Sequence, residues 1–482
     1  MMARSSLRRL VWREFHDHTR SHRFLGLAAI ATLLAPIVIS AGVRDYSTRR
    51  LQYDLLIEQR TAAESPHAGR LTGRQLELAL RLVRLPASPM VLVRGFSGIV
   101  PRFWDFAPDG LYPASGDDAT ARTPQSGVSP DLEFVIRIVL GLLAISVAAG
   151  SIASDREIGT LKVFLSQPVS TLSLIVAKLL GGGAAMVLAL ILVISTSMSA
   201  LGFIGPVLWT ADFKWTLAGV GMTSALYLGV LYALGLLLGL VARSLSAANV
   251  LAVNAWVILV MTSTPGFDFL ARVLAPVPPH EVITTRRQTT YETWRDQSEM
   301  EIGSWYLATV GPTWRTEALT QANHDEIAKR WNGRVAVVRE DLGRIDAQLN
   351  SAASRQRAVW SKLSSWTPGS LFFDATSRIA GTGLPTAESW DAFARNAQLG
   401  LQQALFDQPA FLTLAVPANP GRGLLRVELR PSPRASSLVP GIPSSVPVRG
   451  RLADAMRPCA TLIGYLAALI GLIIYVFPGR RR

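Results

Sequence analysis

Six uncharged windows constrain this chain of 482 residues more than any other feature of its sequence. A helix needs about 20 residues to cross roughly 30 Å of hydrocarbon. The windows run from Phe24 to Val43, Ile138 to Ser154, Leu179 to Ala211, Trp215 to Ala242, Ser244 to Phe267 and Pro458 to Gly479. We therefore predict a mainly α-helical membrane protein with six transmembrane helices, and the mean hydropathy of +0.30 agrees with this class.

The predicted spans cover residues 24–43, 133–153, 171–201, 215–242, 243–267 and 456–478. The first span has a second interpretation, because a basic segment before an apolar run is also typical of a cleaved signal peptide. Its apolar core is longer than the roughly 7 to 15 residues of such peptides. We expect it to be retained as a span.

Basic residues in the short connections predict the orientation, because cytoplasmic loops of membrane proteins are enriched in Lys and Arg. Six spans place the segment 1–23, the connection 154–170 and the tail 479–482 on one side, and all three carry basic residues. The outer loop 202–214 has only one Lys and one Asp. Both termini are therefore expected in the cytoplasm, and much of the net charge of +14 reflects this topology rather than nucleic-acid binding.

Two insertions, residues 44–132 and 268–455, are expected on the extracytoplasmic side. The first begins with a helical stretch, and the Pro and Gly residues that follow argue against long regular elements. The second is large enough to be a domain and is expected to be mostly helical. The chain has a single cysteine, Cys459, which excludes internal disulfides.

The larger insertion contains an apolar stripe with helical spacing. Its members are 4, 4, 3, 4, 3 and 4 residues apart, as on one face of a helix. They are Ile327, Trp331, Val335, Val338, Leu342, Ile345 and Leu349. Two interpretations stay open, namely an amphipathic helix packed on its own domain and a coiled-coil arm that binds a partner.

Motifs for nucleotide, metal and hydrolytic chemistry are missing from the sequence. It has no G-x-x-x-x-G-K-[ST] phosphate loop, no H-E-x-x-H helix and no G-x-S-x-G elbow. The chain is therefore not expected to be an enzyme, nor to hold a metal or a cofactor. Two charged residues near span ends, Arg137 and Lys178, are interpreted as side chains that reach the interface by snorkelling.

The connection 154–170 reads SDREIGTLKVFLSQPVS and lies between the second and third predicted spans. Ser154 and Glu157 have the spacing of a capping box, which predicts the start of a helix. The apolar residues that would share one face of this helix are Ile158, Leu161 and Leu165. Pro168 ends the helix because it lacks an amide proton. The pattern predicts a short amphipathic helix at the membrane surface, although a plain interfacial connector fits it too.

This connection resembles the hallmark segment of ABC type-2 transporter permeases. The matching residues are Glu157-x-Gly159-Thr160-Leu161, then Leu165-Ser166-x-Pro168-Val169-Ser170, then Lys178. Trp12-Arg13-Glu14, before the first span, is similar to the elbow region of the same family. Two patches in the larger insertion, residues 366–372 and 379–383, resemble a subgroup with an extracytoplasmic domain of unknown function.

The resemblance implies a permease of the bacterial inner membrane. It would work with a separate ATPase, present in two copies that bind ATP and Mg, and with a second permease protomer, either identical or related. The coupling helix that docks on the ATPase would contain Glu157, Gly159, Thr160, Leu161, Leu165 and Pro168. The elbow helix in the membrane interface would have an apolar side formed by Leu7, Leu10, Val11 and Phe15.

The sequence is compatible with three functions from different classes. The favoured one is the membrane subunit of an ATP-driven exporter. The second is a non-transport complex in which the ATPase moves the outer domain as a lever on an envelope or periplasmic protein, and the stripe at 327–349 motivates it. A membrane enzyme is the third, and it would need a cluster of His, Asp or Ser at one membrane depth, which the predicted spans lack.

Overall fold

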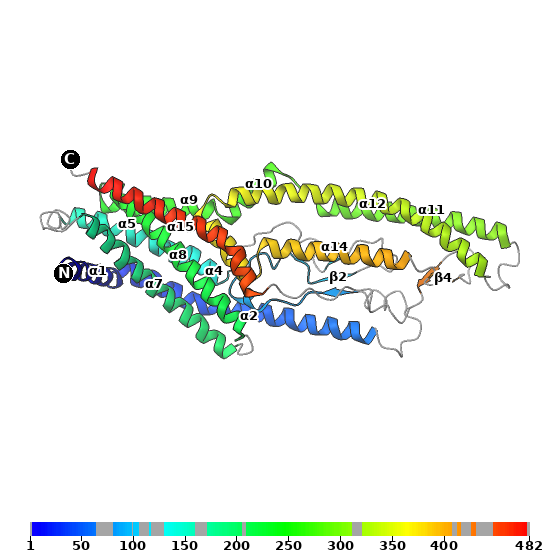
Figure 1. Ribbon diagram of the computed structural model, residues 1–482, viewed down its shortest axis with the longest axis horizontal. Coiled ribbons are helices and arrows are strands. Elements are labelled where there is room, and N and C mark those ends of the chain that lie inside the picture. Colours follow the sequence, from blue (N-terminus) through cyan, green and yellow to red (C-terminus); the bar gives the residue numbers. More distant parts are fainter. Residues whose placement is uncertain are drawn as a thin grey trace.

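The chain folds into a bundle of long helices from which a second group of helices extends (Figure 1). This computed structural model describes residues 2–63, 81–98, 100–105, 115–116, 130–159, 171–204, 209–310, 321–406, 412–415, 426–429 and 447–479. Both ends of the chain lie at the same end of the bundle, which we call the terminal end (Figure 1). We call the other end, from which the second group of helices extends, the arm end.

Within the described residues, five helices are long and apolar enough to cross a membrane. The first is α2 (His22–Ala63), and the second joins α4 (Leu132–Phe134), the π-helix η3 (Val135–Leu140) and α5 (Gly141–Glu157). The others are α7 (Thr171–Ile204), α8 (Ala211–Val241) and α15 (Val448–Gly479). The chain is thus a mainly helical, multi-pass membrane protein.

A sixth candidate span is broken. It consists of α9 (Leu245–Met261) and α10 (Thr264–Leu274), which are bent by 45° relative to each other. Pro265 lies at the start of α10 and has no amide proton, so it cannot continue the hydrogen bonds of α9. The predicted fifth span at 243–267 therefore corresponds to a bent pair of helices rather than to one straight helix.

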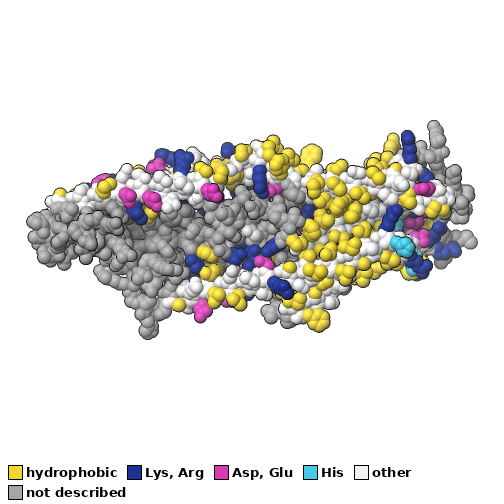
Figure 2. Space-filling model, turned by 180° about the vertical axis from the view of Figure 1, so that it is seen from behind, with side chains coloured by type: hydrophobic (Ala, Val, Ile, Leu, Met, Phe, Trp, Pro, Cys, Tyr) yellow, Lys and Arg dark blue, Asp and Glu magenta, His cyan; other side chains and the backbone are white. Residues whose placement is uncertain are grey.

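Hydrophobic side chains cover one face of the bundle in Figure 2, and charged side chains gather at its terminal end. Large apolar residues of the spans, such as Leu33, Ile37 and Met222, are exposed on the bundle. Inside the bundle, α5 and α8 approach closely at two glycines, because a Cβ on Gly235 or Gly239 would strike the backbone of α5. Small residues at such crossings are typical of membrane helices.

Helix α13 (Pro368–Ala380) returns from the insertion 268–455 to the bundle. Thr367 caps it by accepting a hydrogen bond from the Ser370 amide, and Gly381 follows its last residue with φ +70°. Phe372 is fully buried and stacks on Tyr227 of α8, with 4.5 Å between the ring centroids. The patches 366–372 and 379–383 are therefore the two ends of a helix that packs on α8 and α15.

The arm consists of α11 (His280–Val310) and α12 (Gln321–Ser364), which run side by side away from the bundle (Figure 1). Trp294 donates from Nε1 to the Arg334 carbonyl at 2.9 Å, and Arg287 pairs with Asp346 at 2.8 Å. At a rise of 1.5 Å per residue, the 44 residues of α12 extend about 66 Å. Helix α14 (Leu384–Phe406) lies beside this pair and completes the second group of helices.

The apolar stripe lies within this arm. Val335, Val338, Leu342 and Ile345 are buried, and Leu349 is partly buried. The side chains of Ile327 and Trp331 lie outside the described residues. Because α10 and α11 pack on α12, the described part of the stripe is covered by the chain itself. The amphipathic-helix interpretation therefore accounts for these residues, and a partner would meet other faces of the arm.

The first insertion, residues 44–132, begins as a direct continuation of α2 to Ala63. Three short strands follow in antiparallel order, β1 (Leu82–Val83), β2 (Phe103–Asp105) and β3 (Ser115–Gly116), with the short helix η1 (Ser88–Val91) between β1 and β2. Strands β4 (Leu412–Ala415) and β5 (Arg426–Leu429) form a second antiparallel pair. The segment after η1 docks on the end of α13, where Thr382 donates to the Val93 carbonyl at 3.0 Å.

Candidate functional site

A buried cluster of charged side chains joins three helices at the terminal end. Lys178 of α7 is only 3% exposed. Its Nζ lies 3.0 and 3.1 Å from the two carboxylate oxygens of Glu14, on helix α1 (Met2–Thr19), and 2.6 Å from Asp155 Oδ2 on α5. The interpretation of Lys178 as a snorkelling side chain is therefore wrong, because its charge is neutralised inside the protein. We call these three residues the Lys178 cluster.

His18 and Tyr232 extend the Lys178 cluster to α8. The Tyr232 hydroxyl and His18 Nε2 are 2.8 Å apart, and the two rings meet edge to face. Burial, with a further contribution from the positive charge of Lys178, lowers the pKa of His18 to about 4. Burial also raises the pKa of Glu14, against the opposing effect of Lys178. A neutral His18 is therefore part of the folded arrangement near neutral pH.

Helix α1 lies along the start of α7 and packs on it through its apolar side. Leu7, Leu10, Val11 and Phe15 are each partly buried. Gly181 permits the close contact, because a Cβ at this position would come within 2.7 Å of Glu14 Cβ and of the Val11 carbonyl oxygen. The structure thus places the predicted elbow residues against α7, with Arg8, Arg9 and Trp12 on the exposed side of the helix.

Arg156 and Glu157, at the end of α5, hold the turn between α8 and α9. Arg156 donates to the carbonyls of Ala242 and Leu240, where the helix dipole of α8 is negative. Glu157 Oε2 accepts a hydrogen bond of 3.0 Å from the amide of Leu245, at the positive end of α9. Two consecutive side chains therefore bind α5 to both sides of one turn.

The capping box predicted at Ser154 and Glu157 is not formed. Ser154 lies in the last turn of α5, which continues to Glu157, and Glu157 caps α9 instead of the start of a new helix. Helix α5 ends at Glu157 with Ile158 as its C-cap, and Gly159 follows with φ +85°. The described chain stops at Gly159 and resumes at Thr171, so Thr160, Leu161, Leu165 and Pro168 lie outside the described residues.

A second polar cluster lies at the arm end of the bundle. Arg137, 7% exposed, is 2.7 Å from Glu133 and donates to the Ser263 hydroxyl at 2.9 Å. The interpretation of Arg137 as a snorkelling residue is therefore also wrong. The π-helix η3 widens the turn here, and its Ile138 carbonyl accepts a hydrogen bond from Trp256 of α9. This cluster ties the second span to the bend between α9 and α10.

No local pattern in the sequence reveals the partners of these buried charges. Glu14 lies in the segment that resembles an elbow, and Asp155 lies in the connection 154–170, so each belongs to a different local motif. The available signal was that Glu14, Asp155 and Lys178 all lie at the edges of apolar windows that end on the same predicted side. Among the residues that the structure describes, no group of three or more His, Cys, Asp or Glu side chains could hold a metal ion.

The helices and their buried charged junctions define a multi-pass helical membrane protein. Residues 8–479 match the family model described as ABC-2 family transporter protein. Since this match spans nearly all of the chain, the protein belongs to that family and is a membrane permease component of an ABC system. A comparison with curated proteins found no match.

Proposed function

We propose that this chain is the permease subunit of an ABC type-2 exporter of the bacterial inner membrane, with its terminal end in the cytoplasm. Two copies of a separate ATPase, which bind ATP and Mg, dock on the segment 158–170 and beside α1. A second protomer, identical or related, completes the transport unit. The observation that carries this proposal is the Lys178 cluster, because it ties α1 to the two helices that flank the segment 158–170.

Force applied at the segment 158–170 would move several helices together. The segment is attached to α5 on one side and to α7 on the other, and Lys178 joins both to α1. Arg156 and Glu157 extend the connection to α8 and α9. A push by the ATPase therefore displaces the terminal ends of these helices as one unit and re-angles the spans. No bond chemistry is assigned to this chain.

The test is reconstitution of the permease with its ATPase and measurement of ATP hydrolysis. Leu161→Asp places a charge on the predicted apolar face of the segment and is expected to abolish the stimulation of the ATPase by the permease. Lys162→Gln, on another face of the same segment, serves as the matched control and is expected to retain it. Normal stimulation in Leu161→Asp, with the protein inserted in the membrane, would contradict the proposal.

A second function is favoured by the length of the arm. Helix α12 is about 66 Å long at a rise of 1.5 Å per residue, and the arm projects from the end opposite the proposed ATPase site. In this alternative the chain transports nothing, and motion of the bundle swings the arm against an envelope or periplasmic protein. Pocket-lining residues along the arm, among them Thr290, Gln297 and Val337, would form part of the contact surface.

Shortening the arm separates the two functions. Deletion of residues 303–329, with a short Gly-Ser linker between Ile302 and Arg330, removes the outer part of both long helices. The paired positions Arg287 with Asp346 and Trp294 with Arg334 remain. Loss of an envelope partner in cross-linking, with normal ATPase stimulation, would support the lever. If the shortened protein keeps both its cross-links and its ATPase stimulation, the lever is excluded and the exporter is the function that is left.

A further inference from the structure

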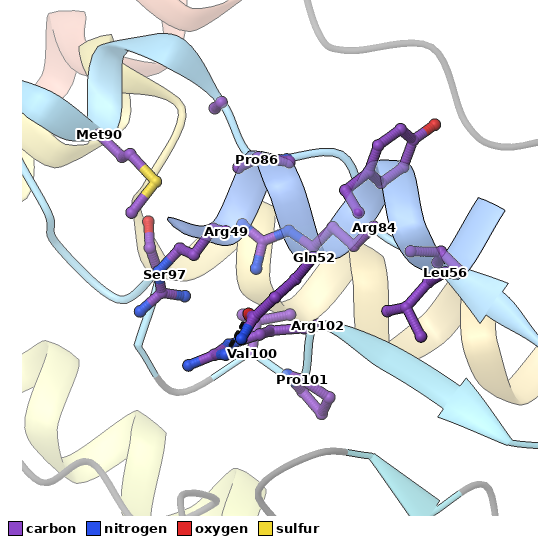
Figure 3. Close-up of a pocket in the computed structure, with 13 residues that line it drawn as sticks. Arg49, Gln52, Leu56, Arg84, Pro86, Met90, Ser97, Val100, Pro101 and Arg102 are labelled. Carbon is purple, nitrogen blue, oxygen red and sulfur yellow. Dashed lines mark hydrogen bonds between the residues drawn. The ribbon is translucent and has the colours of Figure 1, made fainter. Parts of the chain in front are cut away.

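A small cavity lies beside α2, where the chain between β1 and β2 folds against this helix (Figure 3). Three of its lining residues are arginines from separate stretches, with Arg49 on α2, Arg84 directly after β1 and Arg102 directly before β2. None of the lining residues that the structure describes is acidic. The others include Gln52 and Tyr53 of α2, the buried Ser97, and apolar groups such as Pro86 and Val100.

Several arginines gather around this cavity, and their partners among the described residues include Asp45, Gln52 and Asp391. Asp45 lies 3.1 Å from Arg49 and 2.6 Å from Arg94, so a single carboxylate serves two guanidinium groups. Arg102 donates to the neutral amide oxygen of Gln52 at 2.5 Å, as Figure 3 shows. Burial, and then the charge of nearby Arg49, lowers the pKa of Arg84 to about 10, against the opposing effect of Asp391. A small anion in the cavity would be attracted by the charges of the arginines that line it.

The size and lining of the cavity fit one oxyanion group. The space that water-sized groups can occupy is about 30 Å³, which holds a single small group and not a whole lipid or sugar. Guanidinium groups present donors in a planar fork that matches the oxygens of a phosphate. The Pro and Val side chains around it keep the local dielectric low, which strengthens the attraction between unlike charges.

The cavity lies close to the expected headgroup layer of the membrane. Arg49 lies six residues beyond Val43, the end of the first apolar window, which corresponds to about 9 Å along a helix. The headgroup layer extends roughly 5 to 8 Å from the hydrocarbon on each side. The α2 backbone at Arg49 therefore lies just outside the headgroup layer, within the length of an arginine side chain of the lipid phosphates.

We propose that this cavity binds one phosphoryl group, with Arg49, Arg84 and Arg102 as its ligands. The group belongs either to the headgroup of an anionic phospholipid or to a soluble phosphate compound. Binding there would fix the first insertion on α2 and so influence the contact of residues 93–96 with the end of α13. The proposal needs no ATPase, so it stands or falls separately from the exporter function.

The test uses the purified full-length chain in detergent, with two probes. Inorganic phosphate is titrated while the midpoint of thermal unfolding is followed, and retention of phosphatidylglycerol over phosphatidylcholine is measured by native mass spectrometry. Arg84→Gln and Arg102→Gln each remove a charge-assisted contact and are expected to weaken binding by about tenfold or more. Arg81→Gln is the control, because Arg81 lies over the Phe103 ring and does not line the cavity.

Each outcome has a definite meaning. Selective retention of phosphatidylglycerol that is lost in both variants supports the lipid source, and stabilisation by inorganic phosphate that is lost in both supports the soluble source. Equal binding in the variants and in Arg81→Gln, or binding of neither probe, overturns the proposal. Should Arg84→Gln not fold, Arg84→Lys keeps the charge while losing the planar fork, and Arg102→Gln gives an independent measurement.

Discussion

Lys178 shows how strongly one buried charge depends on its partners. An ammonium group inside a protein loses several kcal/mol of hydration, which the nearby carboxylates of Glu14 and Asp155 restore. Because both carboxylates share Lys178, its removal takes the counter-charge away from both of them, whereas removal of one carboxylate leaves Lys178 paired with the other. The Lys178 cluster therefore stabilises one arrangement of α1, α5 and α7 and disfavours those in which the three helices separate.

We expect Lys178→Met to destabilise the protein by about 3 to 5 kcal/mol, since it removes the shared cation from the buried carboxylate of Glu14 and the partly buried carboxylate of Asp155. The midpoint of thermal unfolding in detergent is the measurement. The triple variant with Glu14→Gln and Asp155→Asn is expected to recover most of the loss, because no unpaired charge remains. Lys214→Met, at an exposed position of α8, is the control. An equal loss in the triple variant would mean that packing and not charge is responsible.

His18 predicts a pH dependence of stability. Its pKa is about 4 in the folded protein against an ordinary 6.5, so the unfolded chain binds more protons between these values. Stability is therefore lost as the pH falls from about 6.5 to about 4, by roughly 3 kcal/mol in full. The raised pKa of Glu14 acts in the opposite direction and offsets part of this loss. Asp155, Lys178 and Tyr232 also face this site.

His18→Gln is expected to reduce the difference between the unfolding midpoints at pH 7 and pH 5. The glutamine cannot take up a proton, whereas it can still hydrogen bond to the Tyr232 hydroxyl. His22→Gln, at an exposed position, is expected to keep the pH dependence of the wild type. A pH dependence that is the same in both variants would remove His18 as its source.

Partners of charged residues were the part of the site that the sequence did not predict. Glu14 and Lys178 are 164 residues apart, and no local pattern relates them. Glu157 was predicted to cap its own helix, but it caps α9, which begins 88 residues later in the chain. Local spacing identifies residues that are able to cap or pair, whereas tertiary packing decides which helix end or charge they meet.

At the scale of elements, the end of α5 decides how the segment 158–170 leaves the bundle. Helices commonly end with a glycine of positive φ, and Gly159 has φ +85°. Gly159→Val is expected to be strained there and to alter the exit of the segment, which reduces ATPase stimulation. Gly159→Asn tolerates this conformation better and is the matched control. Equal ATPase stimulation in both variants would show that this conformation is not needed for coupling.

Neighbouring glycines on α7 give an internal comparison for the contact of α1 with α7. Gly181→Ala brings a methyl group to within 2.7 Å of Glu14 and Val11, whereas Gly183→Ala meets no atom within 4 Å. Both gain up to about 1 kcal/mol from helix propensity. We expect Gly181→Ala to lower the midpoint of thermal unfolding and Gly183→Ala to keep or raise it. A similar result for both would mean that α1 does not rest on Gly181 in the membrane.

Elements were predicted better than contacts, because apolar runs and capping residues are local. The helical character of residues 44–63, the stripe near 335–345 and the spans followed from periodicity and length. The return of α13 to the bundle did not, although Thr367-Pro368 at its start and Gly381 at its end are typical cap residues. Composition assigned this stretch to the outer domain, and only the packing of Phe372 on Tyr227 places it on the spans.

At the scale of the whole molecule, the two ends of the protein are expected on opposite sides of the membrane. The sole cysteine, Cys459, is first replaced by Ala. Single cysteines are then introduced at the exposed positions Arg20, at the terminal end, and Ser351, on the arm. A membrane-impermeant thiol reagent is expected to label Ser351→Cys in spheroplasts and Arg20→Cys only after lysis. The reverse labelling would invert the proposed topology.

The Lys178 cluster also sets an order of events during synthesis. Glu14 leaves the ribosome 164 residues before Lys178 does, which at about 5 to 20 residues per second is a delay of roughly 8 to 33 s. Throughout that time α1 has no α7 to rest on. During this delay its exposed arginines are able to hold α1 at the membrane surface. The ion pair between Glu14 and Lys178 forms only after the start of the third span has been synthesised.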